Sequence, residues 1–178
     1  MSTPANSSSL SSARPSIRIR AAALAEDSAI MHLINAAFVV ERVAFDGDRI
    51  DREGVQLLLS KGTFLIAEPS DASSPCAPDP VGCVYLEPQG DRCYLGLLSV
   101  APAMQSRGIG RQLALAAEDF ARQAGCTAID LRIISPRAHD LLPLYARLGY
   151  IEAGTSPIPD EGQSKIPCHY IAMTKALA

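Results

Sequence analysis

The sequence lacks the features that mark membrane-spanning and nucleic-acid-binding proteins. None of its apolar runs approaches the roughly 18 residues needed to cross a bilayer, so no membrane partner is expected. It has no excess of basic residues, because 16 Lys and Arg stand against 19 Asp and Glu and give a net charge of -3. That charge argues against binding to nucleic acid and slightly favours a cationic small substrate.

The sequence also lacks a paired-cysteine motif. Its cysteines are odd in number, and no two of them have the two-residue gap of a zinc or redox motif. No metal site is therefore expected. Cysteine usage of this kind indicates a reducing compartment, so we expect a cytoplasmic protein. The cysteines are Cys76, Cys83, Cys93, Cys126 and Cys168.

A chain of 178 residues has little room for two full domains. Residues 1–15 are rich in Ser and Pro and lack the apolar block of a secretory signal, so we expect a disordered tail there. An organelle transit peptide is the alternative, supported by Arg14 and by the lack of acidic residues in this stretch. Residues 16–178 are expected to form a single domain.

Hydrophobic periodicity predicts an α/β fold with a mixed sheet. Alternation of Ile17 and Ile19 with arginines predicts a first strand, and a helix is expected from an N-cap at Asp27 to about Phe38. Between two strands, residues 69–80 form a Pro- and Ser-rich excursion. Further strands are expected over 63–68, 81–87, 92–100, 127–134 and 168–177, and further helices over 52–62, from near 108 to 125, and over 139–149. One or two strands are expected after the last helix, and only 168–177 is given a range.

The segment AMQSRGIGR, residues 103–111, lies between a predicted strand and a predicted helix. The first backbone N–H groups of a helix have no partner within the helix, and with the helix dipole they attract phosphate. Gly108 and Gly110 would remove the Cβ atoms that keep a diphosphate away, and Arg107 and Arg111 would add positive charge. The alternative is a turn that needs glycine only for its backbone geometry.

Two nucleotide-binding motifs fit this segment poorly. The P-loop motif is excluded because no Gly-Lys-Ser/Thr follows at the required spacing. The dinucleotide motif finds Leu113 where its third glycine should be, and its acidic residue, Asp130, lies near the beginning of a strand. The glycines also follow a predicted hairpin instead of opening a strand–helix–strand unit. A dinucleotide-dependent oxidoreductase is therefore the least favoured alternative.

Residues 97–125, LLSVAPAMQSRGIGRQLALAAEDFARQAG, resemble the coenzyme A-binding core of the GNAT superfamily of N-acetyltransferases. The family motif Gln/Arg-x-x-Gly-x-Gly/Ala is matched by Gln105, Gly108 and Gly110, preceded by Val100-Ala101-Pro102. A second family segment, Leu-Tyr-x-x-x-Gly-Phe/Tyr, is matched within PLYARLGY and includes Tyr145. The resemblance extends over roughly residues 16–178 without the 69–80 insertion.

This resemblance implies a mostly antiparallel sheet of about seven strands, splayed between strands four and five and flanked by about four helices. It implies acetyl-CoA as cofactor, with the backbone of Leu98, Ser99 and Val100 pairing with the pantetheine arm. The family often has Asn where this chain has Ala138, at a position that contacts the cofactor. The pyrophosphate would be held at Gln105, Ser106, Arg107, Gly108, Ile109, Gly110 and Arg111.

The implied activity is transfer of an acetyl group from acetyl-CoA to a primary amine, by direct attack in a ternary complex. Tyr145 would protonate the departing thiolate, although its alignment with Leu141 and Leu148 also suits a core aromatic residue. No carboxylate occupies the fourth-strand position that serves as base in some members; Tyr94 stands there. The remaining candidates for the base are Glu41, Glu87, His139, His169 and ordered water.

A covalent route through cysteine is not supported. Only Cys168 has a neighbouring histidine, and successive residues of a strand point to opposite faces. A catalytically inactive coenzyme A-binding sensor or interaction module is the main alternative; Ala138 and the missing carboxylate favour it, and Tyr145 opposes it. The expected partner is a small-molecule or peptide amine, and the resemblance also admits a homodimer that pairs through the final strands.

Overall fold

The computed structural model of the chain describes residues 16–70, 79–159 and 164–177, so the expectations for the tail and for most of the 69–80 excursion lie outside it. The strands are β1 (Ile17–Ala21), β2 (Thr63–Pro69), β3 (Gly82–Gln89), β4 (Arg92–Val100), β5 (Ala128–Ile134), β6 (Ile151–Pro157) and β7 (His169–Ala176). The helices are α1 (Asp27–Phe38), α2 (Arg52–Lys61), α3 (Ile109–Gln123) and α4 (Ala138–Arg147), with short 3-10 turns η1 (Leu24–Glu26), η2 (Val39–Val43), η3 (Pro102–Met104) and η4 (Ser135–Arg137).

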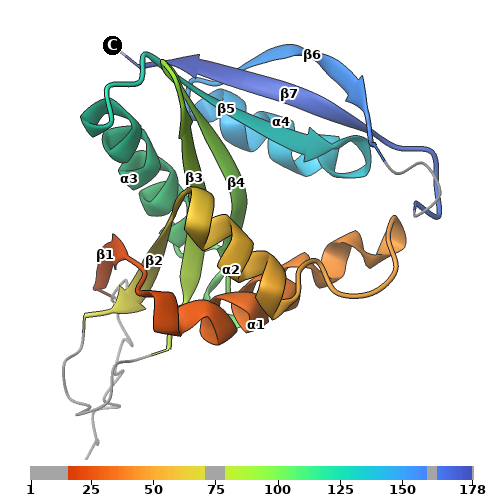
Figure 1. Cartoon of the computed structure of the whole chain (residues 1–178). Helices are drawn as coiled ribbons and strands as arrows, with labels where there is room; N and C mark the ends of the chain where they lie inside the picture. The colour runs from red at the N-terminus through yellow and green to blue at the C-terminus, as the bar shows by residue number, and fades with distance from the viewer. Residues whose placement is uncertain (1–15, 71–78, 160–163, 178) are drawn as a thin grey trace, which may run out of the picture.

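The seven strands form one sheet in the order β1-β2-β3-β4-β5-β7-β6 (Figure 1). Every neighbouring pair is antiparallel except β4 and β5, which are parallel. The predicted mixed, mostly antiparallel sheet with four helices is therefore confirmed. Among the described residues, no helix is both long and apolar enough to span a bilayer.

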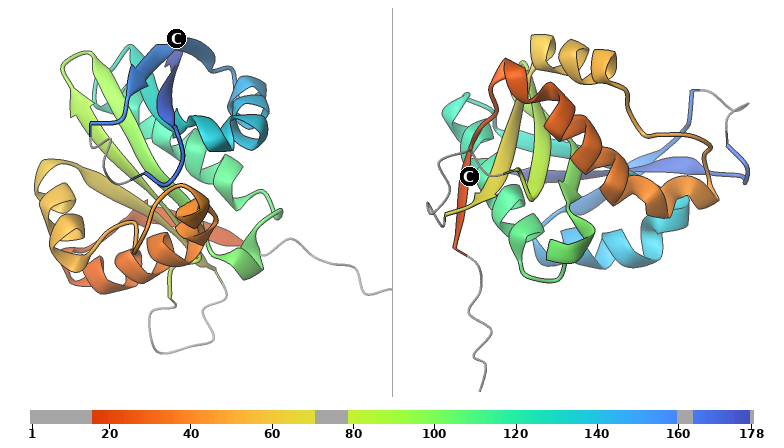
Figure 2. Two further views of the ribbon diagram at one scale, coloured as in Figure 1. Left: turned by 90° about the vertical axis from the view of Figure 1, so that its right-hand side faces the viewer. Right: turned by 90° about the horizontal axis from the view of Figure 1, so that it is seen from below.

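Helices cover both faces of the sheet. Helices α1 and α2 lie on one side of β2, β3 and β4, and α3 lies on the other side (Figure 2). Strands β2 and β3 are buried on both faces, which explains their nearly continuous apolar sequences. On α3, Leu113, Ala117 and Ala121 recur at four-residue steps and are fully buried against the sheet.

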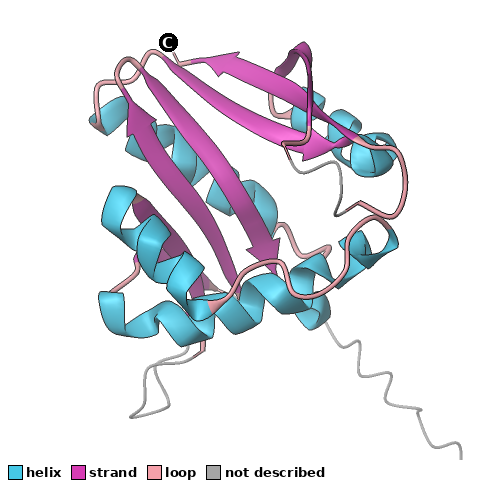
Figure 3. Cartoon of the chain, turned by 45° about the vertical axis from the view of Figure 1, so that its right-hand side comes forward, coloured by secondary structure: helices cyan, strands magenta, loops and turns pink. Residues whose placement is uncertain are grey.

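Strands β4 and β5 pair over only four residues and then diverge. Their register runs from Arg92–Ala128 to Leu95–Leu131, and beyond it the two strands separate (Figure 3). In the second half of β4 a bulge places Leu97 at φ +50°, and the hydroxyl of Ser99 donates to the Leu97 carbonyl at 3.0 Å. The predicted splaying between the fourth and fifth strands is confirmed, and it opens one edge of β4.

Two local features were undecided or wrongly predicted from the sequence. The sequence left open whether one or two strands follow the last helix, and the structure has two. Strand β6 was given no range because all of its residues are exposed, so it has no apolar alternation. Asp27 is not the N-cap but the first residue of α1. Its buried carboxylate accepts hydrogen bonds from Ser28 N, Arg52 Nε and Gln56 Nε2, and so ties α1 to α2.

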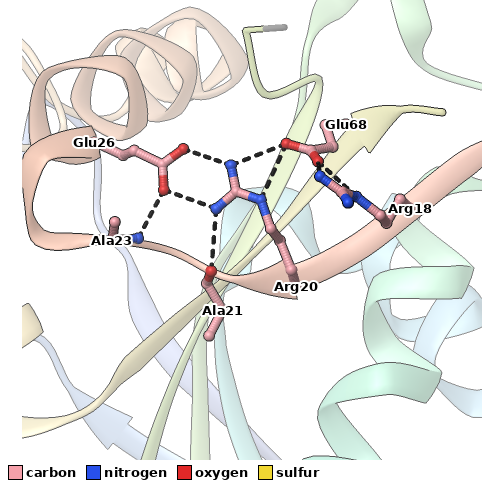
Figure 4. Close-up of polar contacts among 6 residues, drawn as sticks. All are labelled: Arg18, Arg20, Ala21, Ala23, Glu26 and Glu68. Atoms are coloured by element: carbon pink, nitrogen blue, oxygen red, sulfur yellow. Dashed lines mark hydrogen bonds and ion pairs between the residues drawn. The ribbon is translucent and has the colours of Figure 1, made fainter. Parts of the chain in front are cut away.

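A cluster of ion pairs holds β1 against β2 and η1. The carboxylate of Glu68, in β2, is 1% exposed and pairs with Arg18 and Arg20 of β1 (Figure 4). Arg20 also binds Glu26, with its Nη2 at 2.7 Å from Oε1. The two guanidinium groups hold the pKa of Glu68 below its usual value, because they stabilise the charged form.

Replacement of Glu68 by Gln is expected to lower the free energy of unfolding by about 2 kcal/mol at neutral pH, between the values for exposed and buried pairs. Since the folded-state pKa lies below the unfolded value near 4.5, the stabilisation is complete above that value and is lost as the pH falls through the folded pKa. Denaturant unfolding at a series of pH values measures it. Arg18→Ala is the control and should cost less, because that side chain is 67% exposed and Arg20 remains; equal stability of Glu68→Gln and wild type at neutral pH would contradict the prediction.

Candidate functional site

A cleft of about 580 Å³ lies where β4 and β5 diverge. Its lining comes from the end of α1 with η2, the loop before α2, β4, the glycine segment with α3, β5 with η4, α4, and Tyr170 of β7. Of the residues predicted for the site, it is lined by Glu41, Tyr94, Leu98, Val100, Gln105, Ser106, Gly108, Ile109, Gly110, Arg111 and Tyr145.

One end of the cleft is formed by the glycine segment before α3. Ser106 and Gly108 both have positive φ, +62° and +83°, and Gly108 is the N-cap residue of the helix. The first helical hydrogen bond runs from Gln112 N to Gly108 O at 3.1 Å. No backbone carbonyl of the described residues accepts a hydrogen bond from the N–H groups of residues 106–111. These free donors at a helix N-terminus suit an anionic group such as a phosphate.

The backbone of this segment lies close to the free edge of β4. Gln105 Nε2 donates to the Val100 carbonyl at 3.1 Å and holds the segment against the strand. A Cβ atom on Gly110 would lie 3.7 Å from the side chains of both Leu98 and Val100. Because glycine has no Cβ atom, a ligand can approach the backbone more closely at this position. Arg111 lines the cleft, whereas Arg107 is exposed outside its lining. A ligand with a diphosphate and an extended arm therefore fits this end.

Tyr145 reaches the cleft from α4. Its side chain is 6% exposed and meets the Tyr150 ring edge-on, with ring centroids 5.5 Å apart. Burial disfavours the phenolate and raises the pKa of Tyr145 to about 12. The phenol therefore keeps its proton over the whole neutral range and can act as a donor.

Two of the candidates for the base also lie in the cleft. The carboxylate of Glu41, in η2, is 13% exposed; burial raises its pKa, and the positive charges of Arg49 and Arg137 oppose that rise. Tyr94 leans along β4 over Gly96, where a Cβ atom would lie 2.8 Å from its ring. Burial raises the pKa of Tyr94 as well. Glu41 is the one Asp or Glu residue among those that line this cleft.

Several predicted site residues lie outside the cleft lining. Glu87 accepts a hydrogen bond from Tyr85 Oη at 2.7 Å, and His169 is exposed at the start of β7. Ser99 as a whole is 1% exposed and does not line the cleft. His139 is 76% exposed beside Asp140, and Ala138 packs against the main core.

Two alternatives receive no support from this geometry. Asp130 pairs with Arg92, which also bonds the Thr174 hydroxyl, so the acid expected to bind a dinucleotide ribose is already engaged. Strands β2, β3 and β4 that precede the glycines form an antiparallel meander, which is not a dinucleotide-binding unit. Within the described ranges, no three His, Cys, Asp or Glu residues are grouped to hold a metal ion.

Comparison with known families decides the assignment. The sequence matches the family model described as Acetyltransferase (GNAT) family over residues 29–150, which is more than half of the chain. The chain belongs to the GNAT acetyltransferase family. The matched range of this GNAT chain includes η2, β4, the glycine segment, α3 and Tyr145.

Solved structures share the GNAT fold along the whole domain. The ribosomal-protein-S18-alanine N-acetyltransferase from Escherichia coli has a TM-score of 0.68 and 17% identity, with 92% of this chain and 95% of that chain covered. Nourseothricin acetyltransferase has a TM-score of 0.67 and 19% identity, with coverage of 91% and 99%. The NatC complex bound to Gag peptide and CoA has a TM-score of 0.68 and 19% identity, again covering 91% and 99%.

At the second end of the cleft of this GNAT protein, only Glu41 and Tyr94 were singled out from the sequence. This end is also lined by Phe38, Arg49, Arg132, Arg137 and Tyr170. One signal was present: Arg132 interrupts the apolar strand DLRII next to the carboxyl end of a strand parallel to β4. Carboxyl ends of parallel strands meet at one edge, where ligands bind. The other four lie in segments whose pairing the sequence does not reveal.

Proposed function

We propose that this protein transfers an acetyl group from acetyl-CoA to a primary amine by direct attack within a ternary complex. The observation that carries the proposal is one cleft that joins the free N–H groups before α3, the unpaired edge of β4 and the buried phenol of Tyr145. When bound, acetyl-CoA supplies an activated acyl group on a thiol leaving group. Everything else required must come from residues of this chain.

The residues at the α3 end fit the cofactor. The N–H groups of residues 106–111 and the Arg111 side chain would bind the pyrophosphate, and Gly110 lets it approach the backbone. Past Leu95, β4 no longer pairs with β5, so its backbone groups are available to an extended arm. A backbone N–H at the bulge near Leu97 would also polarise the thioester carbonyl.

Glu41 and Tyr145 would move the two protons of the reaction. An alkyl amine is mostly protonated at neutral pH, and Glu41, whose pKa is raised by burial, would accept its proton. Tyr145 would donate its hydroxyl proton toward the departing sulfur, since it stays protonated up to a pH of about 12. The two side chains line one cleft from opposite walls, η2 and α4.

Direct transfer is also supported by the cysteines. None of the cysteines in the described residues lines the cleft. Burial raises the pKa of Cys83 to about 12 and that of Cys93 to about 11, so both remain poorly nucleophilic thiols.

The test is the release of free thiol from acetyl-CoA in the presence of a panel of primary amines, together with calorimetric titration by acetyl-CoA and by NADH. Acetyl-CoA binding and amine-dependent thiol release are expected. Binding of NADH without binding of acetyl-CoA would overturn the proposal. Acetyl-CoA binding without release for any amine would instead indicate the inactive sensor.

Replacement of Glu41 by Gln is expected to lower kcat/KM for the amine by about 100-fold at neutral pH, because the base is lost. The pKa of Glu41 is raised above its usual 4.5, so wild-type kcat/KM should fall as the pH drops through that raised value and Glu41 becomes protonated. The variant should lack this acidic limb. Steady-state rates across pH measure both effects.

Glu152→Gln, on exposed β6 and outside the cleft, is the control and should retain the wild-type profile. If kcat/KM of Glu41→Gln stays within twofold of wild type, Glu41 is not the base, and water accepts the proton of the amine.

A further inference from the structure

The acceptor end of the cleft is positively charged, although the whole chain has a net charge of -3. Three arginines, Arg49, Arg132 and Arg137, line it, and Glu41 is the one carboxylate among them. They come from three separate parts of the chain: the loop before α2, strand β5 and turn η4. A site for a simple cationic amine has no use for such an excess of guanidinium groups.

These arginines differ in how far they are already engaged. Arg137 has its Nε 3.5 Å from Asp140, and it is only 22% exposed. Arg49 has its Nε 4.0 Å from Glu41 and its guanidinium 5.5 Å from the centre of the Phe38 ring. Arg132 forms no hydrogen bond or ion pair with any residue that the structure describes. Its five N–H donors are therefore available to a ligand.

Arg132 and Arg49 line the same cleft as Tyr94 and Tyr145. Burial raises the pKa of Tyr94, and the positive charges of Arg132 and Arg49 oppose that rise. The two guanidinium groups therefore belong to the cleft in which the acetyl group would be transferred.

The acceptor region is also limited in size. A second cleft of about 330 Å³ adjoins the first and shares Glu41, Arg49 and Tyr170 with it. The η2 region also contacts the segment before β7, where Phe45 and Ser164 form a β-bridge and Lys165 N donates to the Ala44 carbonyl at 2.8 Å. The second cleft contains two further carboxylates, and both are paired: Asp46 with Lys165 at 2.6 Å and Asp48 with Arg42 at 3.0 Å. Volumes of about 580 and 330 Å³ suit a small molecule.

We infer that the acceptor is a small amine that also carries a carboxylate or another oxyanion group, and that Arg132 and Arg49 bind that group. The inference rests on the proposed acetyltransferase function. Charge-assisted bonds from a planar guanidinium to an oxyanion are strong and directional, so they would orient the amine toward Glu41. The excess of positive charge also favours the unprotonated form of a nearby amine, which is the form that attacks.

The test uses matched pairs of acceptors that differ only in the acidic group: amino acids with their carboxamides, and aminoalkylphosphonates with the corresponding alkylamines. Wild-type kcat/KM is expected to be at least about tenfold higher for the acidic member, as one charge-assisted interaction provides. Comparison of the carboxylate and phosphonate series identifies which oxyanion the site prefers.

Variants of the two arginines locate the effect. Arg132→Ala should raise KM for acidic acceptors about tenfold and leave KM for neutral amines and for acetyl-CoA unchanged. Arg132→Lys should retain part of the preference, because it keeps the charge but not the planar pair of donors. Arg147→Ala, at the exposed end of α4 and outside both clefts, is the control and should behave as wild type.

The outcomes separate this inference from the function on which it rests. Equal turnover of acidic and neutral members by wild type would overturn the inference and leave the acetyltransferase function intact. A preference that persists in both Arg132→Ala and Arg49→Ala would overturn the assignment to these residues, as would faster acetylation of peptides than of any small acidic amine. Failure to acetylate any amine would overturn the function and the inference together.

Discussion

Tyr145→Phe is expected to lower kcat by about 100-fold or more while the Kd for acetyl-CoA stays within about twofold, in line with the usual contribution of a general acid. The substitution removes one oxygen and leaves the ring in its packing against Tyr150. Without the hydroxyl, the departing sulfur must take its proton from water. Single-turnover rates and calorimetric titration of the same preparation measure the two quantities separately.

The pH dependence of the wild-type enzyme provides a second view of this residue. Because burial raises the pKa of Tyr145 to about 12, the phenol should lose its proton only near that pH. We therefore expect no basic limb from Tyr145 in the neutral range. A limb that appears near the ordinary tyrosine value and vanishes in Tyr145→Phe would contradict the burial of its hydroxyl.

Tyr150→Phe is a closely matched control. Tyr150 is 2% exposed and contacts Tyr145, but it does not line the cleft, and its buried hydroxyl has no hydrogen-bond partner among the described residues. Removing an unsatisfied buried hydroxyl should leave kcat unchanged and stability equal or higher. If Tyr145→Phe behaves like Tyr150→Phe, then Tyr145 is a core aromatic residue and another group protonates the sulfur.

Gly110→Glu is expected to weaken acetyl-CoA binding by about 100-fold or more, through combined steric and charge repulsion. The new side chain would project from the surface beside Leu98 and Val100, and its carboxylate would compete with the pyrophosphate for the free N–H groups of the segment. An acidic residue in the first turn of a helix favours the helix itself, so the fold should be retained. Calorimetric titration with acetyl-CoA and thermal unfolding are the two measurements.

Gln112→Glu separates the effect of position from that of charge. Gln112 lies on the same helix, is exposed, and does not line the cleft. The same added charge there is partly screened by solvent, so the Kd should change by less than about threefold. If both variants weaken acetyl-CoA binding equally, the effect of Gly110→Glu is due only to the added negative charge and not to its position. If Gly110→Glu binds acetyl-CoA normally, the cofactor lies elsewhere.

Most of the fold followed from local patterns. The buried central strands and the α3 helix have strong apolar periodicity, and their predicted positions agree with the structure to within a few residues. The position of strand β6 could not be predicted because neither of its faces is buried. Asp27 was expected to cap its own helix, but its carboxylate bonds Arg52 and Gln56 of α2, and nothing in the local sequence indicates that partner.

The residues that line the α3 end of the cleft could be identified from the sequence for a related reason. They form one continuous segment, from the second half of β4 through the glycines into α3. Loop conformation and helix start are decided within that segment, so a short motif is enough to identify them. The candidates for the base are different. Glu41, Glu87, Tyr94, His139 and His169 could not be ranked from the sequence, and of these only Glu41 and Tyr94 line the cleft.

The amino-acid sequence by itself determined the strands and helices with a buried face and the glycine turn before α3, because both depend on interactions between near neighbours in the chain. Only the tertiary structure decided which charged groups line the other end of the cleft. Arg49, Arg132, Glu41 and Tyr170 are brought together by the divergence of β4 from β5 and by the contact between the η2 region and the segment before β7. Electrostatic interactions depend on the distance between charged groups in space, and for residues far apart in the sequence that distance is fixed only when the whole sheet is assembled.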